Sequence, residues 1–291
     1  EARAQVQMGR GSRPFWVGRR AFAPQSCFLI IIQNMLTALA LTTIAGLATI
    51  LGSLIALSER AREPKALGAA LAFAAGAMLT VSALELLPHS IGVLGAGTTT
   101  LYCVAGLVIV GALDLASRAW ERRAVTSARE ATQPSDSSRA RALLRTGLIT
   151  ALALTAHNIP EGFATFSSAL QDTAFALPLA GAIALHNIPE GVAVAAPILH
   201  ATGSRTKAIA ATALSGLSEP VGALALYGLL TATGHAANLE WANPLIAGVM
   251  IAISAVELLP LAYTHSRLTR TLTWCGIGAL VMAASLWALG G

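Results

Sequence analysis

The sequence predicts an all-α integral membrane protein with eight transmembrane helices. An inverted repeat is expected to relate helices 1–3 to helices 6–8, with helices 4 and 5 between them. Three observations lead to this fold class: few charged residues, long apolar blocks and two pairs of matching segments. The 291-residue chain is 55% hydrophobic and only 11% charged, against about 25% charged residues in an average soluble domain. A water-soluble fold cannot cover its surface with so few charges.

The apolar blocks have the length that a bilayer requires, because a hydrocarbon core about 30 Å thick is crossed by about 20 helical residues. They lie near residues 28–57, 66–88, 93–117, 143–168, 173–200, 208–232, 244–263 and 271–289. We assign them to one transmembrane domain over residues 28–291, with a Ser-, Arg- and Ala-rich loop over residues 118–142. Residues 1–27, which are arginine-rich and poor in acidic residues, are expected to form a disordered extension outside this domain.

The positive charges between the blocks predict the orientation in the membrane. Fourteen Lys and Arg residues lie in the connections 1–2, 3–4, 5–6 and 7–8, if Arg145 at the start of the fourth block is counted with its connection, and none lies in the other three connections. By the positive-inside rule, the four basic connections face the cytoplasm. We therefore expect a multi-pass protein of the cell (inner) membrane with both termini on the outer, periplasmic side. The five arginines of residues 1–27 disagree with this orientation.

Several classes of function are disfavoured. The net charge of +5 comes from residues between apolar blocks, which form no single basic face with interleaved aromatics, so nucleic-acid binding is not expected and the partner surface is the lipid bilayer. The three cysteines (Cys27, Cys103 and Cys275) lie far apart without a CxxC spacing, and we expect them to pack among apolar residues. The sequence lacks GxxxxGK[ST], so neither ATP nor another organic cofactor is expected.

Two internal matches predict the inverted repeat. GAMLTVSALELLP (residues 76–88) and GVMIAISAVELLP (residues 248–260) agree at eight of thirteen positions, in helices expected to cross in opposite directions. HNIPEG occurs at residues 157–162 and again at 186–191, also in oppositely directed helices. Inverted repeats are typical of secondary transporters, in which the substrate lies between the repeats near the membrane midplane.

Each HNIPEG places its histidine, asparagine and glutamate on one helical face, because the spacings are i, i+3 and i, i+4. A charged residue at the centre of a span costs roughly 2.5–3.5 kcal/mol on insertion scales, and Glu161, Glu190 and Glu219 all lie at such depths. A bound dication is the simplest compensation. The alternative is that Pro160 and Pro189 are packing kinks and that each histidine pairs with its own glutamate.

Imidazole and carboxylate ligands favour zinc, with cadmium, iron, manganese and cobalt as further substrates, and two histidines argue against calcium. Met78, at mid-depth in the second helix, is a candidate thioether ligand, although a lone methionine on an apolar helix also suits a core. Glu85 and Glu257 end the two matched segments near opposite membrane faces. They are expected either to feed and release metal or to be solvated.

These motifs resemble the ZIP (Zrt/Irt-like) metal transporters, and most closely the bacterial ZupT-like zinc-uptake branch. The resemblance covers residues 35–291 and is carried by AGAMLTVSALELLP, both HNIPEG copies and SGLSEPVGA. It implies a binuclear centre in which Glu161 and Glu190 bridge two metals. The resemblance assigns His157, His186 and Met78 to the first metal and Asn158, Asn187 and Glu219 to the second. Some family members carry Gln-Asp in place of His186 and Asn187, so here the first site gains an imidazole and the second loses a negative charge.

The expected function is uptake of divalent metal ions by alternating access, and the chain is not expected to be an enzyme. The resemblance implies an elevator-like motion of helices 1, 4, 5 and 6. Two alternatives remain open: an intramembrane zinc metallohydrolase and metal export, because inverted repeats do not set the direction of flux. The sequence also leaves the oligomeric state open, and a homodimer is one arrangement that it allows.

Overall fold

The computed structural model describes residues 24–128, 155–236 and 238–290, and every regular element in these ranges is helical. The α-helices are α1 (Pro24–Ala56), α2 (Pro64–Val81), α3 (Leu87–Leu94), α4 (Ala96–Ala128), a helix over 155–171, α6 (Thr173–Thr202), α7 (Arg205–Ala232), α8 (Ala242–Ile253), α9 (Leu259–His265) and α10 (Leu268–Gly290). Short π-helical turns join α2 to α3 (η2, Ser82–Leu86) and α8 to α9 (η3, Ser254–Leu258), and a 3-10 turn (η1, Arg60–Arg62) precedes α2. The prediction of an all-α fold is confirmed.

Seven helical stretches in the described residues are long and apolar enough to cross a membrane. They correspond to seven of the eight predicted blocks, so the chain is a multi-pass membrane protein. The remaining block, 143–168, is helical from residue 155 onward, and residues 143–154 lie outside the described part of the chain. The count of eight transmembrane helices therefore remains a prediction.

Two predicted boundaries differ from the structure. Loop 118–142 was expected to start directly after the third span, but α4 continues to Ala128. Residues 118–128 contain Ala, Arg and Glu and neither glycine nor proline, so nothing in them ends a helix. The expected extension 1–27 overlaps the first turn of α1, which begins at Pro24, a residue suited to a helix start. Residues 1–23 and 129–142 lie outside the described ranges.

Burial separates a central helix from two peripheral ones. The apolar window of α6 is 72% buried, whereas the windows of α4 and α10 are only 11% and 22% buried. Large apolar side chains on these two helices are mostly exposed, such as Leu101, Leu280 and Trp287. Surfaces of this kind suit lipid rather than water, so α4 and α10 lie at the outside of the bundle.

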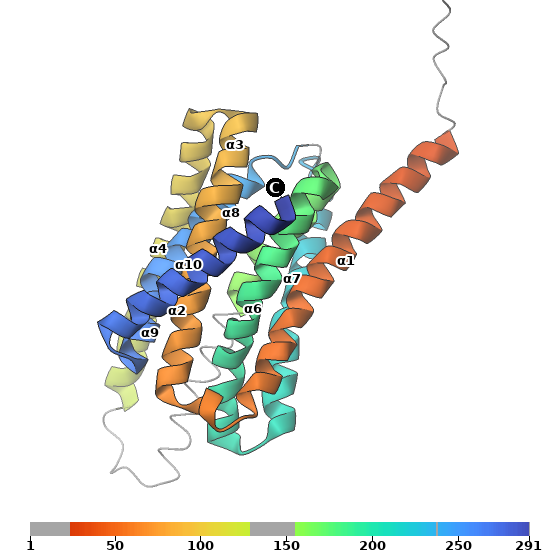
Figure 1. The fold of residues 1–291 in the computed structure, drawn as a ribbon. Helices are drawn as coiled ribbons and strands as arrows, with labels where there is room; N and C mark the ends of the chain where they lie inside the picture. The colour runs from red at the N-terminus through yellow and green to blue at the C-terminus, as the bar shows by residue number, and fades with distance from the viewer. Residues whose placement is uncertain (1–23, 129–154, 237, 291) are drawn as a thin grey trace, which may run out of the picture.

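The helices form two groups that meet at α6 (Figure 1). In the first group, α1 packs along α6 and α7. In the second group, α2 packs along α10, and α4 packs along α8. The central helix α6 also contacts α2 and α10 and so joins the two groups.

Glycine seams within the second group follow the predicted repeat. A side chain at Gly76 would overlap the backbone oxygen of Cys275, and one at Gly248 would overlap that of Cys103. The same shift in residue number relates Gly76 to Gly248 and Cys103 to Cys275. The contact of α2 with α10 and that of α4 with α8 are therefore equivalent, and the repeat identified from sequence extends to helix packing. Small residues permit such close approach of membrane helices.

The two π-helical turns also occupy matching places in the repeat. In η2 the backbone N–H of Leu87 donates to Ser82, and in η3 that of Leu259 donates to Ser254. The proline that follows each ELL segment has no N–H to donate, which disturbs the regular ladder at this point. Such turns are frequent at functional sites, and these two carry Glu85 and Glu257.

Candidate metal centre

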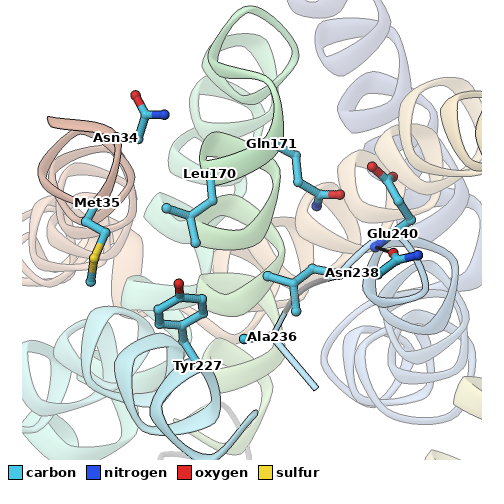
Figure 2. A pocket seen from close by; sticks show the side chains of 9 residues that line it. Asn34, Met35, Leu170, Gln171, Tyr227, Ala236, Asn238 and Glu240 are labelled. Atoms are coloured by element: carbon cyan, nitrogen blue, oxygen red, sulfur yellow. Dashed lines mark hydrogen bonds between the residues drawn. The ribbon is translucent and has the colours of Figure 1, made fainter. Parts of the chain in front are cut away.

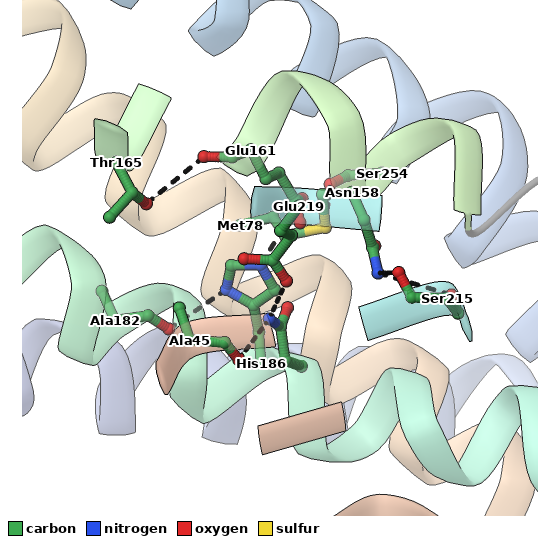
Figure 3. Close-up of polar contacts among 11 residues, drawn as sticks. Ala45, Met78, Asn158, Glu161, Thr165, Ala182, His186, Ser215, Glu219 and Ser254 are labelled. Atoms are coloured by element: carbon green, nitrogen blue, oxygen red, sulfur yellow. Dashed lines mark hydrogen bonds and ion pairs between the residues drawn. The ribbon is translucent and has the colours of Figure 1, made fainter. Parts of the chain in front are cut away.

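Three predicted ligands converge at the contact between the helix 155–171 and α6. One ligand atom from each of Glu161, His186 and Glu190 lies within 4.8 Å of the other two. All three side chains are at most 1% exposed. His186 and Glu190 share a face of α6 because they are four residues apart, and Figure 3 shows Glu161 and His186 pointing toward each other from the two helices. We call these three residues the triad.

The triad is rich in electron pairs and poor in donors. Neither carboxylate oxygen of Glu161 or Glu190 has a hydrogen-bond partner among the described residues. The ring of His186 is oriented by its Nδ1, which lies 3.1 Å from the carbonyl oxygen of Ala182. If Nδ1 donates this bond, Nε2 presents its lone pair 3.5 Å from Oε1 of Glu161. Buried carboxylates without donors are costly, so the arrangement favours a cation between these atoms.

Asn158 and Asn187 each donate a hydrogen bond from the side-chain amide nitrogen to a neighbouring helix. Nδ2 of Asn158 donates to the carbonyl oxygen of Ser215 on α7 at 2.9 Å, and Nδ2 of Asn187 donates to that of Ala45 on α1 at 2.9 Å. Asn187 also donates to Oε1 of Glu219. The Oδ1 atoms of both asparagines have no partner among the described residues. Both amide oxygens thus remain free to accept a ligand.

Glu219 is fully buried on α7 but is not a member of the triad. Its Oε2 has no partner among the described residues, while its Oε1 accepts the bond from Asn187. A side chain at Gly162 would overlap the backbone of Glu219, so this glycine allows α7 to lie against the helix 155–171. The carboxylate is therefore held beside the triad through Asn187.

The other two predicted ligands, Met78 and His157, have partners outside the triad. Sδ of Met78, which is fully buried on α2, lies 3.8 Å from the hydroxyl of Ser254 on η3. Nε2 of His157 lies 3.2 Å from Oε2 of Glu257, whose side chain is 36% exposed. Glu257 is thus neither fully solvated nor at the triad, and it connects His157 to the accessible surface.

Sequence reasoning missed the backbone acceptors of the site. The carbonyl groups of Ala45 and Ser215 carry no signal in a motif of ligand residue types. The position of Ser215 in the SGLSEP segment was the only available indication for it. Likewise, the pairing of His157 with Glu257 depends on the packing of two segments a hundred residues apart.

A groove of about 600 Å³ lies elsewhere in the bundle (Figure 2). It is bounded by the N-terminal part of α1, the end of the helix 155–171, α7 and the segment before α8. Its lining residues are Asn34, Met35, Leu170, Gln171, Tyr227, Ala236, Asn238, Leu239 and Glu240. None of the predicted metal ligands is among them. The buried ring of Phe166 precedes Leu170 by one helical turn and lies on the same helix as Glu161.

The family profile of the ZIP zinc transporters matches residues 121–285, more than half of the chain. The chain belongs to the ZIP zinc transporter family. Relatives of this ZIP protein match over nearly its whole length. The zinc transporter ZupT of Stenotrophomonas maltophilia strain K279a is 39% identical over 266 residues, covering 87% of this chain and 96% of the relative. The zinc transporters ZupT of Clostridium perfringens and Streptococcus mutans are each 38% identical, covering 88% and 87% of this chain and 96% and 98% of the relatives.

The ZIP resemblance that the motifs predicted is thus confirmed. The matched proteins are named as transporters and not as enzymes, so this ZIP chain belongs to a family of transporters. The alternative of an intramembrane metallohydrolase has no support from these relatives.

Proposed function

We propose that this ZIP protein carries zinc across the cell membrane into the cytoplasm by alternating access. The observation that carries the proposal is the triad, in which two buried glutamates without donors face the histidine Nε2 of the same site. The names of the relatives supply the substrate, zinc. The metal-cofactor site of a water-soluble protein is not a suitable comparison, because the triad lies among helices long enough to cross a membrane.

The proposed centre holds two metal positions that share Glu161 and Glu190. The first position is completed by His186, with Met78 and His157 as further ligands. The second is completed by the Oδ1 atoms of Asn158 and Asn187 together with Glu219. The unpartnered oxygen atoms of Glu161, Glu190, Asn158, Asn187 and Glu219 support their role as ligands. His157 would have to leave Glu257 to join the first position, so its ligation is expected in only part of the cycle.

The donor set also leads to a proposal about selectivity. Nitrogen and carboxylate ligands bind zinc and cadmium well and accept iron, manganese and cobalt. Calcium and magnesium favour sites made only of oxygen. Millimolar magnesium should therefore not compete with micromolar zinc for transport.

For the conformational change we propose that α1, the helix 155–171, α6 and α7 move together against the other helices. Asn158 and Asn187 support this grouping, because each binds a carbonyl group on another helix of the same group. Met78 and Ser254 are bonded to each other within the second group. The metal would travel with Glu161, His186 and Glu190, and contacts to Met78 and Glu257 would change.

The proposed release route passes His157 and Glu257. The charge rule puts the end of α9, beside the basic connection 7–8, in the cytoplasm, and Glu257 is the half-exposed carboxylate on this side of the centre. The groove lies toward the opposite face, and the buried side chain of Phe166 lies between it and Glu161 along the helix. We infer that the described conformation is closed toward the outside.

The deciding experiment is zinc flux into proteoliposomes that contain the purified protein. Saturable zinc uptake that is blocked by cadmium and not by magnesium is the expected result. Hydrolysis of lipid or peptide without zinc flux would instead support the metallohydrolase. Proton coupling can be read in the same vesicles from an internal pH dye.

The orientation has its own test. A single cysteine at Ser135, in a protein whose native cysteines are replaced, should react with a membrane-impermeant maleimide only from the cytoplasmic side. Labelling from the outside would reverse the proposed topology and, with it, the assignment of Glu257 to the release route.

A further inference from the structure

Thr49 on α1 carries a buried hydroxyl group that the proposed mechanism does not use. Three other threonines of the same helix each donate to the carbonyl oxygen four residues earlier: Thr37, Thr42 and Thr43. Thr49 is fully buried, and its Oγ1 has no partner among the described residues. A buried hydroxyl group without a partner is costly, and each such group in a folded protein requires an explanation.

The local reason is that the carbonyl group four residues before Thr49 is engaged by the metal centre. This group belongs to Ala45, and it accepts the amide hydrogen of Asn187. The hydroxyl of Thr49 is therefore turned away from its own helix at the place where α1 meets the centre. A side chain at Gly191, next to the ligand Glu190, would overlap the backbone oxygen of Thr49. Thr49 thus lies directly beside the second HNIPEG segment.

The inverted repeat gives Thr49 a counterpart. The bond from Asn187 to Ala45 on α1 is equivalent to the bond from Asn158 to Ser215 on α7. The shift in residue number that relates Ala45 to Ser215 relates Thr49 to Glu219. The hydroxyl of Thr49 therefore occupies, on α1, the place that a ligand carboxylate occupies on α7.

The helix crossing confirms that the two positions are equivalent in space. Gly46 and Gly216 face each other so closely that a side chain on either would overlap the backbone of the other. A Cβ at Gly46 would lie 3.4 Å from Cδ of Glu219, and one at Gly216 would lie 3.2 Å from Oγ1 of Thr49. The two side chains thus flank the crossing symmetrically, one ending in a carboxyl group and the other in a hydroxyl group.

The neighbouring amides explain why Oγ1 of Thr49 has no partner while Oε1 of Glu219 accepts a hydrogen bond. Asn187 donates both to Ala45 and to Glu219. Its counterpart Asn158 donates to the carbonyl of Ser215 at 2.9 Å and reaches the hydroxyl of the same serine at 3.4 Å. Since Ala45 has no hydroxyl, this second acceptor exists only on the α7 side. The amide of Asn158 is therefore satisfied by Ser215 and does not bond to Thr49, so the hydroxyl of Thr49 remains without a partner among the described residues.

We propose that Thr49 is a specificity-determining residue of the transport site, whose hydroxyl supplies a neutral oxygen to a metal at the position shared with Asn158 and Asn187. The inference rests on the proposed function. Neutral oxygen ligands favour harder cations, and among the expected substrates manganese is harder than zinc. Thr49 therefore raises the affinity of the site for manganese. Zinc is bound by the triad, with its imidazole, and does not require the Thr49 hydroxyl.

The test compares zinc and manganese binding to the purified full-length protein in detergent, with competition between the two metals in proteoliposome flux. Thr49→Val keeps the shape and removes the hydroxyl. The expected result is a loss of manganese affinity of about fivefold, as for one lost polar contact, with a smaller loss for zinc. Thr42→Val is the matched control, because Thr42 is equally buried on α1 but bonds within its own helix; it should leave the manganese-to-zinc ratio unchanged.

A second pair of variants protects the test against a folding defect. Thr49→Ser keeps the hydroxyl and should keep the ratio of manganese affinity to zinc affinity. Thr49→Ala removes the hydroxyl and should lower this ratio. Parallel loss of both metals, an unchanged ratio in Thr49→Val, or no manganese binding by the unmodified protein would overturn the proposal. Failure of the unmodified protein to bind or transport zinc would instead refute the proposed function.

Discussion

His157 and His186 come from copies of the same hexapeptide, yet the structure gives their rings different partners. The ring of His186 is held by Ala182 and faces Glu161, whereas that of His157 faces Glu257. The family resemblance assigned both histidines to the first metal without distinguishing them. From these surroundings we expect His186 to be a resident ligand and His157 to exchange Glu257 for the metal during transport.

This difference predicts unequal effects of substitution on metal binding. His186→Ala should weaken equilibrium zinc binding by at least about tenfold, because it removes a nitrogen from the triad. His157→Ala should weaken binding less and should slow zinc release into the vesicle. Isothermal titration and single-turnover flux measure the two quantities. Equal losses of binding in both variants would contradict the division of roles, and Glu257→Gln serves as the control that replaces only the carboxylate beside His157 with a neutral amide.

The carboxylates are also expected to rank. Glu161→Ala or Glu190→Ala should reduce zinc flux to background, because each side chain is proposed to serve both metals. Glu219→Ala should keep substantial flux with altered affinity or selectivity, because this carboxylate lies outside the triad and is bonded to Asn187. Zinc flux by the three variants, matched for membrane abundance, is the measurement. A Glu219→Ala variant as inactive as Glu161→Ala would end the shared-bridge proposal.

At the scale of elements, glycines allow the backbones of paired helices to approach closely, and such contacts occur in both copies of the repeat. The contact of α2 with α10 matches that of α4 with α8. Because the backbones touch at these points, there is no room for even one methyl group. Other glycines of the same helices face open space and could accept a methyl group. The effect of a close contact can therefore be tested by comparing two glycines of one helix.

Gly106→Ala should destabilise the protein, since its new Cβ would overlap the backbone of Leu245 on α8. Overpacking of this kind costs roughly 1–3 kcal/mol. Gly111→Ala, on the same helix with no atom within 4 Å of the new Cβ, should be neutral or stabilising by up to about 1 kcal/mol from helix propensity. Thermal unfolding in detergent compares the two. Equal midpoints would show that α4 and α8 do not touch as described.

At the scale of the whole molecule, one contact between the two helix groups is well placed to report their motion. The ring of His89 on α3 stacks on Phe175 near the start of α6, with ring centroids 3.9 Å apart. If the groups slide past each other during transport, this contact must break. A contact inside one group must persist.

Cysteines at His89 and Phe175, in a protein without native cysteines, should become linked by a short reducible thiol cross-linker. The link should reduce zinc flux to background, and reduction should restore the flux. The matched control is a pair at Tyr102 and Trp241, whose ring centroids lie 6.3 Å apart within the second group; linking them should leave transport intact. Full flux with the first pair linked would argue against relative motion of the two groups.

The sequence by itself determined the all-α membrane fold, the family and the residue types at the centre. Apolar runs and fixed i, i+4 spacings are local properties, so the spans and the shared faces of the two HNIPEG copies could be predicted without knowing any contact. The helical continuation of α4 beyond residue 118 was missed, because a charged composition suits an exposed helix as well as a loop.

Only the tertiary structure decided which of the candidate side chains meet. It joined Glu161, His186 and Glu190, turned His157 toward Glu257, and brought the carbonyl of Ala45 into contact with Asn187. These outcomes depend on how closely glycines let helices distant in sequence approach each other, at Gly46 and Gly216 above all. A backbone carbonyl comes to lie beside a candidate ligand through such packing, and this packing depends on pairs of residues rather than on a local pattern.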